Sequence, residues 1–160
     1  MKMMPLWMCL ILLGASAIAQ PATEQEKNKA VTRSFFEDVL DQGHLDRYAE
    51  SHAANFVAHS KDGNMTLQDD LAAAREERKA MPDMHMTVNH MIAERDMVAV
   101  YWTASGTNTH EGMGFPATGK HIVVPGMTLF RFSDGKIVEE WSVFDMLSVM
   151  QQAGLLPSGK

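Results

Sequence analysis

The chain has 160 residues, 46% of them hydrophobic, and a formal net charge of −6, which suggests one domain that can bury its own core. Its basic residues are not clustered, so nucleic acid and anionic membrane surfaces are poor partners. Its single cysteine is Cys9, near the N-terminus, so the rest of the sequence offers no disulfide, thiol nucleophile or thiolate metal ligand.

The N-terminal segment has the pattern of a secretory signal peptide. Lys2 supplies a positive charge, residues 6–13 an apolar run, and Ala17-Ile18-Ala19 a small-x-small cleavage site before Gln20. The apolar run is too short to span a bilayer. We therefore expect residues 1–19 to be removed and residues 20–160 to form one domain. That domain would be secreted or periplasmic, without stable membrane insertion.

Local signals then predict helices followed by strands. Thr23 and Glu26 have the spacing of a capping box, which predicts a helix that ends at Gly43. Thr66 predicts the N-cap of another helix, which ends before Pro82. The remaining pattern predicts a short helix over 45–52, strands over 55–60, 84–94, 97–109, 121–133 and 136–145, and closing helical turns over 146–153.

The last two strands suggest where a site could lie. Asp134-Gly135 between two apolar runs predicts a tight hairpin. Alternation along the second run predicts that Ile137, Trp141, Val143 and Asp145 share one face. Helices followed by antiparallel strands predict an α+β domain with helices on one side of a strongly curved sheet. A conical cavity against the concave face of such a sheet is a common small-molecule site.

Several short sequence motifs follow one another along the chain after the predicted signal peptide. They are Asn28-Lys29-Ala30-Val31, Phe56-Val57-Ala58-His59, and residues 93–100, 102–107, 115–120, 130–137 and 141–145. In this order they resemble the SnoaL-like polyketide cyclase, or ester cyclase, family of the NTF2-like superfamily. The resemblance implies a cone-shaped α+β barrel, usually oligomeric, with an apolar pocket and no metal or organic cofactor.

The resemblance also implies an activity. Characterised cyclases of the family close a ring by aldol condensation, with an aspartate in the last strand as acid and base. Asp145 falls on that position in this sequence, and His59 matches a pocket histidine of many members. Ala58 replaces the acidic residue that commonly precedes this histidine.

The residues themselves leave alternatives open. Asp145 is either a proton shuttle, with a pKa that partial burial raises, or the N-cap of the helix that begins at Met146. His59 either orients a substrate carbonyl or partners Asp145, or it is a partly buried histidine bonded to backbone. His90 alternates in phase with Val88, so it would face the interior, in a pocket or as a core or interface histidine.

We predict that Phe35, His90, Trp102, Trp141 and Val143 line the pocket, although aromatic walls also serve as ordinary core. The histidines lack metal-ligand spacing, so no metal site is expected. The leading hypothesis is an exported homodimer that cyclises or isomerises a small apolar or aromatic carbonyl compound. The alternative is a non-catalytic protein that carries such a molecule.

Overall fold

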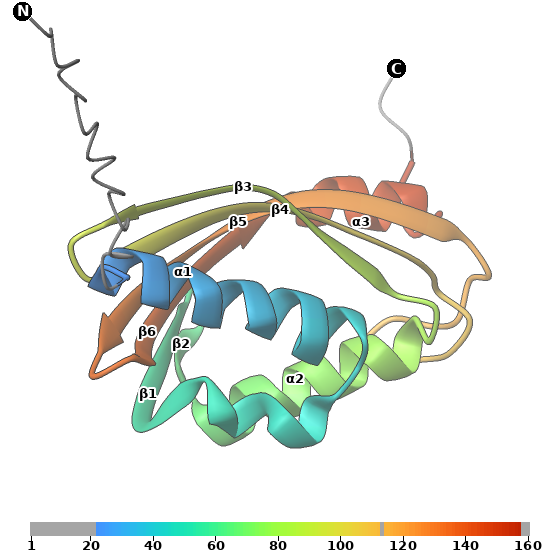
Figure 1. Ribbon diagram of the computed structural model, residues 1–160. Coiled ribbons are helices and arrows are strands. Elements are labelled where there is room, and N and C mark those ends of the chain that lie inside the picture. The colour runs from blue at the N-terminus through green and yellow to red at the C-terminus, as the bar shows by residue number, and fades with distance from the viewer. Residues whose placement is uncertain (1–21, 113, 158–160) are drawn as a thin grey trace, which may run out of the picture.

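The computed structural model describes residues 22–112 and 114–157. The predicted signal peptide at residues 1–19 lies outside the described residues. The described chain builds one six-stranded sheet with helices packed against it (Figure 1). No helix in the described part is long and apolar enough to cross a bilayer.

Both predicted helix caps are present. Thr23 Oγ1 accepts a hydrogen bond from the Glu26 backbone N–H at 3.2 Å, and Thr66 and Asp69 form a reciprocal capping box. The first helix continues as a π-helical segment, which the sequence did not predict. The helical elements are α1 (Glu24–Ser34), the π-helix η1 (Phe35–Asp41), the 3-10 helix η2 (Leu45–Glu50), α2 (Leu67–Ala80) and α3 (Met146–Gln152).

The strands lie in the order β2-β1-β6-β5-β4-β3. The predicted hairpin joins β5 to β6, with Asp134 and Gly135 at φ values of 51° and 72°. The sheet is mixed, because β1 runs parallel to β6 after the chain has crossed over through α2. The strands are β1 (His52–Ser60), β2 (Gly63–Thr66), β3 (His85–Glu94), β4 (Met97–Thr107), β5 (His121–Ser133) and β6 (Lys136–Phe144).

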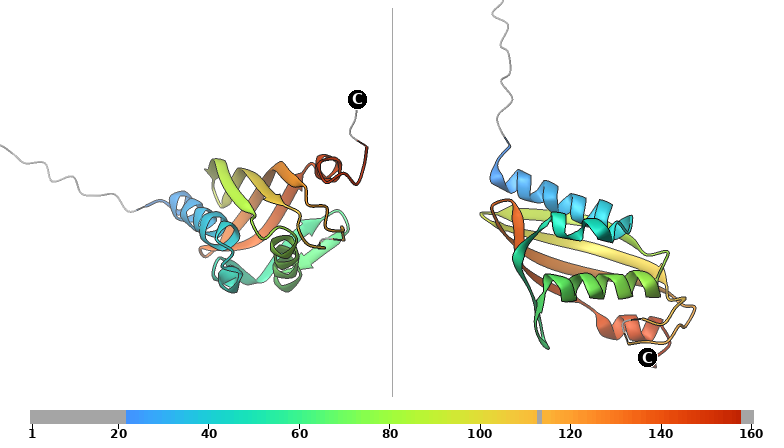
Figure 2. Two further views of the ribbon diagram at one scale, coloured as in Figure 1. Left: turned by 90° about the vertical axis from the view of Figure 1, so that its right-hand side faces the viewer. Right: turned by 90° about the horizontal axis from the view of Figure 1, so that it is seen from below.

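One face of the sheet, here called the inner face, is covered by helices. In two perpendicular views α1, η1 and α2 lie on this side of the curved sheet (Figures 1 and 2). The other side of the sheet is here called the outer face, and none of α1, η1 and α2 covers it. The core fills the space between the inner face and the helices. Its largest members are Phe35, Phe36, Tyr48, Phe56, Trp102, Phe130, Phe132 and Ile137.

Two bulges change which side chains reach the inner face. In β3, Val88 pairs with Trp102 but His90 pairs with Tyr101, so Asn89 is an extra residue. A bulge of this kind reverses the facing of every side chain beyond it.

The second bulge lies in β6. Arg131 pairs with Glu139 and Phe132 pairs with Ile137, so Val138 is the extra residue. Ile137 therefore faces inward with Phe132. The predicted face shared by Ile137 and Trp141 is corrected for this reason.

A side chain of α3 takes the place of a strand partner for β5. The pairing of β6 with β5 begins at Gly126, opposite Phe144, so Val123 lies beyond it. Gln152 Oε1 accepts a hydrogen bond from the Val123 backbone N–H at 2.9 Å, and Gln152 Nε2 donates to the Val123 carbonyl at 2.9 Å. One amide side chain thus satisfies both backbone groups of Val123 on this side.

Candidate functional site

A cluster of ionisable side chains meets on the inner face. Asp70 and Glu77 come from α2, Glu140 from β6 and His52 from the start of β1. Ligand atoms of His52, Asp70 and Glu140 lie within 4.8 Å of one another. The parallel pairing of β1 with β6, which places Ala58 opposite Glu140, brings together residues far apart in the sequence.

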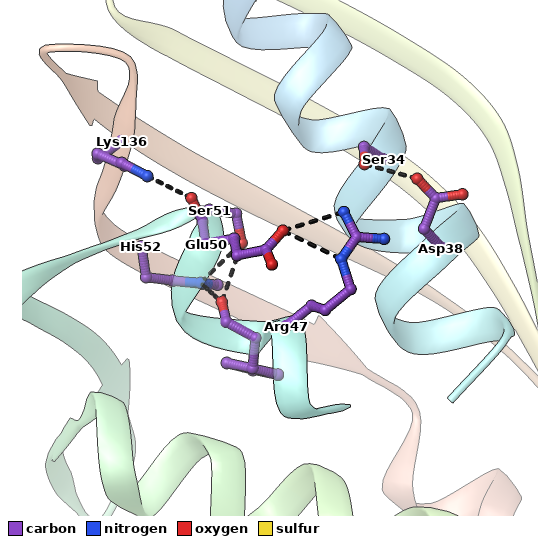
Figure 3. A network of polar contacts seen from close by, with 8 residues as sticks. Ser34, Asp38, Arg47, Glu50, Ser51, His52 and Lys136 are labelled. Carbon is purple, nitrogen blue, oxygen red and sulfur yellow. Dashed lines mark hydrogen bonds and ion pairs between the residues drawn. The ribbon is translucent and has the colours of Figure 1, made fainter. Parts of the chain in front are cut away.

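His52 is held in one orientation by its neighbours. Its ring stacks on Tyr48 at a centroid distance of 4.9 Å, and Phe35 and Phe56 contact it edge-on. Its Nδ1 lies 2.9 Å from the Tyr48 carbonyl oxygen and 3.0 Å from the Ser51 hydroxyl (Figure 3). Because a carbonyl can only accept, we assign the hydrogen to Nδ1 and the lone pair to Nε2.

The free nitrogen of His52 has no hydrogen-bond partner among the described residues. The residue is only 4% exposed. Burial lowers the pKa of His52 to about 4, and the hydrogen bond to the Tyr48 carbonyl opposes this shift only in part. The imidazole is therefore neutral at pH 7.

The carboxyl groups of the cluster hold protons more tightly than isolated carboxyls do. Burial, followed by the charge of the nearby Asp70, raises the pKa of Glu140 to about 8. Burial also raises the pKa of Glu77 to about 7 and the pKa of Asp70. Glu140 is thus mostly a neutral acid at pH 7, in a group of three carboxyls that disfavour one another's ionisation.

Hydroxyl groups hold two of these carboxyls in place. The Tyr48 hydroxyl donates to Asp70 Oδ2 at 2.5 Å, which stabilises the ionised form of Asp70. The Ser142 hydroxyl donates to Glu140 Oε1 at 2.6 Å. Ser142 and Phe144 are exposed on the same face of β6 as Glu140, so the solvent-exposed side of the cluster lies toward this end of the strand.

The structure brings two of the predicted pocket residues to the inner face. Trp102 is 8% exposed, and its Nε1 donates to Thr128 Oγ1 at 2.9 Å. Phe35 packs against His52. Both side chains are members of the core, and Phe35 borders the cluster through His52.

His59 and Trp141 lie together on the outer face, so their predicted place in an interior pocket is corrected. Their rings stack at 4.5 Å with an interplanar angle of 9°. His59 Nε2 lies 3.1 Å from Glu139 Oε2, and Glu139 also pairs with Arg131. The side chains alternate as expected from Glu139 onward, but the bulge at Val138 had not been predicted.

His90 and Val143 are also corrected to the outer face. His90 stacks on Tyr101, which is 39% exposed, because the bulge at Asn89 reverses its phase relative to Val88. Val143 pairs with Met127 on the same face and is 68% exposed.

Asp145 lies at the junction of β6 and α3. It is exposed, and its Oδ1 accepts a hydrogen bond from the Ser148 backbone N–H at 3.0 Å, which makes it the N-cap of α3. This geometry matches the capping alternative. Its role as an acid and base stays a prediction.

The two possible roles of Asp145 predict different effects when the residue is replaced. Replacing it by Asn keeps a cap, so the free energy of unfolding is expected to change little, whereas Ala is expected to cost roughly 0.5–2 kcal/mol. Denaturant unfolding measures both. If the Asp145→Asn variant also keeps full turnover in the assay described below, Asp145 does not transfer the proton.

The apolar pocket stays a prediction as well. A small apolar hollow of about 10 Å³ lies between α3 and the loop around Phe115, and an open depression of about 360 Å³ lies beside Arg131 and Lys136. Neither is lined by a residue of the cluster or of the predicted pocket.

Sequence reasoning missed the cluster, although two signals were present. Asp70, Ala74 and Glu77 are spaced i, i+4, i+7, which puts two acids on the buried side of α2. Glu140 and Ser142 are two residues apart on β6, so a strand places both side chains on the same face.

His52, Asp70 and Glu140 also have donor atoms that can bind a divalent cation, so a metal titration belongs in any assay of the site.

Comparisons with known proteins were made for sequence and structure. A search among curated proteins returned no match. Among solved structures, AclR of Streptomyces galilaeus, assigned as a hydroxylase, has a TM-score of 0.78 and 27% identity over 85% of this chain and 86% of its own. IdmH of Streptomyces antibioticus, assigned as a polyketide cyclase, has a TM-score of 0.69 and 26% identity over 79% and 98% of the two chains.

A third structure supports the fold alone. It is assigned as a SnoaL-like polyketide cyclase of Jannaschia sp. CCS1, with a TM-score of 0.76 and 22% identity over 86% of this chain and 99% of its own. These likenesses confirm the predicted α+β fold. A family model described as SnoaL-like polyketide cyclase matches residues 30–153. The chain therefore belongs to the SnoaL-like polyketide cyclase family.

Proposed function

We propose that this protein catalyses proton transfer on a carbonyl-bearing small molecule, in a cyclisation or isomerisation, at the inner-face cluster. The carrying observation is the meeting of Asp70, Glu140 and His52, whose ligand atoms lie within 4.8 Å of one another on the inner face. Burial there raises the pKa of Glu140 to about 8 and also raises the pKa of Asp70. Titratable groups perturbed by burial and by one another are typical of acid–base sites. Membership of the family supports the same class of reaction.

In this mechanism Asp70 and Glu140 have separate roles. Asp70, whose ionised form the Tyr48 hydroxyl stabilises, removes a proton from the carbon next to a carbonyl. The resulting carbanion attacks a second carbonyl of the same molecule, or is reprotonated elsewhere in an isomerisation. Glu140 gives its proton to the oxygen on which negative charge develops, which is the carbonyl oxygen as the enolate forms or the new alkoxide after ring closure. Trp102 and Phe144 would contact an apolar or aromatic part of the substrate.

The test needs no knowledge of the natural substrate. Ethyl acetoacetate and acetophenone in D₂O serve as probes, and NMR follows exchange of the protons next to their carbonyls. We expect wild-type protein to accelerate exchange, with and without a metal chelator. Binding of the probes with exchange no faster than in protein-free buffer would instead support the non-catalytic carrier.

We also propose that the protein is exported. Lys2, the apolar run of residues 6–13 and Ala17-Ile18-Ala19 support this. N-terminal sequencing of protein from the periplasm or medium is expected to start at Gln20. Cytosolic protein that retains Met1 would contradict the proposal.

A homodimer through the outer face is a further proposal. Met127 of β5 and Val143 of the adjacent β6 are 50% and 68% exposed there, and Ile92 of β3, on the far side of β4, is 71% exposed. Exposed apolar patches of this kind mark association surfaces, and two-fold pairs are the commonest oligomers. Sedimentation is expected to give a dimer that Val143→Glu weakens. Wild-type protein sedimenting as a lone protomer at micromolar concentration would exclude it.

A further inference from the structure

A chain of hydrogen bonds connects the indole of Trp102 with the carboxyl of Glu140. Trp102 Nε1 lies 2.9 Å from Thr128 Oγ1, which lies 2.7 Å from Ser142 Oγ. Ser142 Oγ in turn lies 2.6 Å from Glu140 Oε1. The four residues come from the adjacent strands β4, β5 and β6, and Thr128 and Ser142 are direct cross-strand partners.

The burial of Thr128 decides the direction of this chain. An indole N–H can only donate, so Thr128 Oγ1 accepts from Trp102. Thr128 is 3% exposed, and Ser142 is the only acceptor that the described residues offer to its hydroxyl. If Ser142 donated to Thr128, the Thr128 hydrogen would be buried without a partner, which proteins avoid. Thr128 therefore donates to Ser142, and Ser142 donates to Glu140 Oε1.

We infer that Trp102, Thr128 and Ser142 form a one-way hydrogen-bond chain that keeps Glu140 Oε1 an acceptor and leaves Oε2 to carry the proton. The three residues are positioning residues, since none of them gives or takes the reacting proton. The use of that proton in catalysis rests on the proposed function, but the chain itself does not.

Burial and two carboxyl groups act on the pKa of Glu140 in the opposite sense from Ser142. Donation by Ser142 lowers the pKa of Glu140, because it stabilises the ionised carboxylate. Burial and the facing carboxyls raise it. The groups that face Glu140 from the elements packed around it are Asp70 and Glu77 of α2, His52 of β1 and Tyr48 of η2.

The test is a site-resolved ¹³C NMR titration of the Glu140 carboxyl in the whole protein, assigned by loss of its signal in Glu140→Gln. Ser142→Ala removes the donor, so the titration midpoint is expected to rise by about one pH unit. Thr128→Val does not touch the carboxyl, but it removes the donor that polarises Ser142. In Thr128→Val the titration midpoint of Glu140 is expected to rise by roughly a few tenths of a pH unit. Thr128→Ser is expected to restore the wild-type value.

The reverse direction predicts the opposite sign. If Ser142 donated to Thr128, Thr128→Val would free the Ser142 hydrogen for Glu140, and the midpoint would fall. A midpoint that falls or stays unchanged in Thr128→Val overturns the inference. Thr103→Val is the matched control, because Thr103 lies on the outer side of β4 with its hydroxyl on Asn89. The titration uses no substrate, so a protein without turnover can still support the chain.

Discussion

Glu140→Gln is expected to slow proton exchange on the carbonyl probes by roughly 10²–10⁴-fold, the usual contribution of a general acid or base. The amide keeps the size of the side chain and can still accept from Ser142, but it cannot give up a proton. Probe affinity is expected to change little, because the lost interaction belongs to the transition state. NMR exchange rates, with Kd from a ligand titration, measure both quantities.

Glu139→Gln is the matched control. It is the neighbouring residue, but it faces outward and pairs with Arg131 and His59. We expect exchange to be unaffected there. Equal losses in the two variants would mean that the substitution disturbs the strand and not the chemistry.

The same variant tests the raised pKa of Glu140 through stability. Below about pH 4.5 the carboxyl is protonated in both the folded and the unfolded chain. Between about 4.5 and 8 the unfolded chain loses the proton while the folded chain keeps it, so the folded state binds more protons. The stability of wild-type protein relative to Glu140→Gln should therefore fall as pH rises through this range. Denaturant unfolding at several pH values measures the difference.

Gly126→Ala is expected to destabilise the protein by roughly 1–3 kcal/mol or more, since overpacking a closed site costs this much. A Cβ at position 126 would lie far inside van der Waals contact with the Trp102 ring. The indole would have to move and would lose its hydrogen bond to Thr128. Denaturant unfolding gives the loss, and Trp102 fluorescence is expected to shift.

A double-mutant cycle shows whether the indole is the cause. If it is, Gly126→Ala combined with Trp102→Leu loses less stability than the sum of the two single variants. Additive losses would place the cost in the backbone of β5 instead. Gly126 has no positive φ, so the left-handed region does not explain any strain there.

The boundaries of most elements could be predicted from the sequence because they depend on contacts within a few residues. The Thr23 and Thr66 side chains cap their helices by accepting hydrogen bonds from the backbone three residues further on. Asp134-Gly135 forms the tight turn between two consecutive strands. The strand β2 was missed, because residues 61–64 have the composition of a loop and only pairing with β1 makes part of them extended.

The faces of the strands could be predicted only up to the bulges. Asn89 and Val138 are each one residue too many for the neighbouring strand, and nothing in their own side chains reveals it. The error moved His90 to the wrong side of the sheet, and it put Ile137 on the face of Trp141. Register is decided by cross-strand partners, so a period-2 pattern is reliable only between such points.

The cluster escaped prediction for a different reason. His52, Asp70 and Glu140 lie on three elements whose proximity depends on the parallel pairing of β1 with β6. The sequence predicted only antiparallel neighbours, so it gave no reason to place these residues together. Asp145 was predicted as the acid and base because alternation puts it on the face of Trp141 and because it matches a family position.

The Gln152 side chain that bonds to Val123 also bears on solubility. Residues of β5 before Gly126 still pair with β4, but on the side of β6 no further strand of the described chain lies beside them. An open edge of this kind is a template for pairing with another chain. By binding both the N–H and the carbonyl of Val123, the amide imitates one residue of a missing strand and blocks the edge. Anything that lifts α3 from the sheet would therefore do more than loosen a helix. It would expose a strand end able to recruit a second molecule into an aggregate.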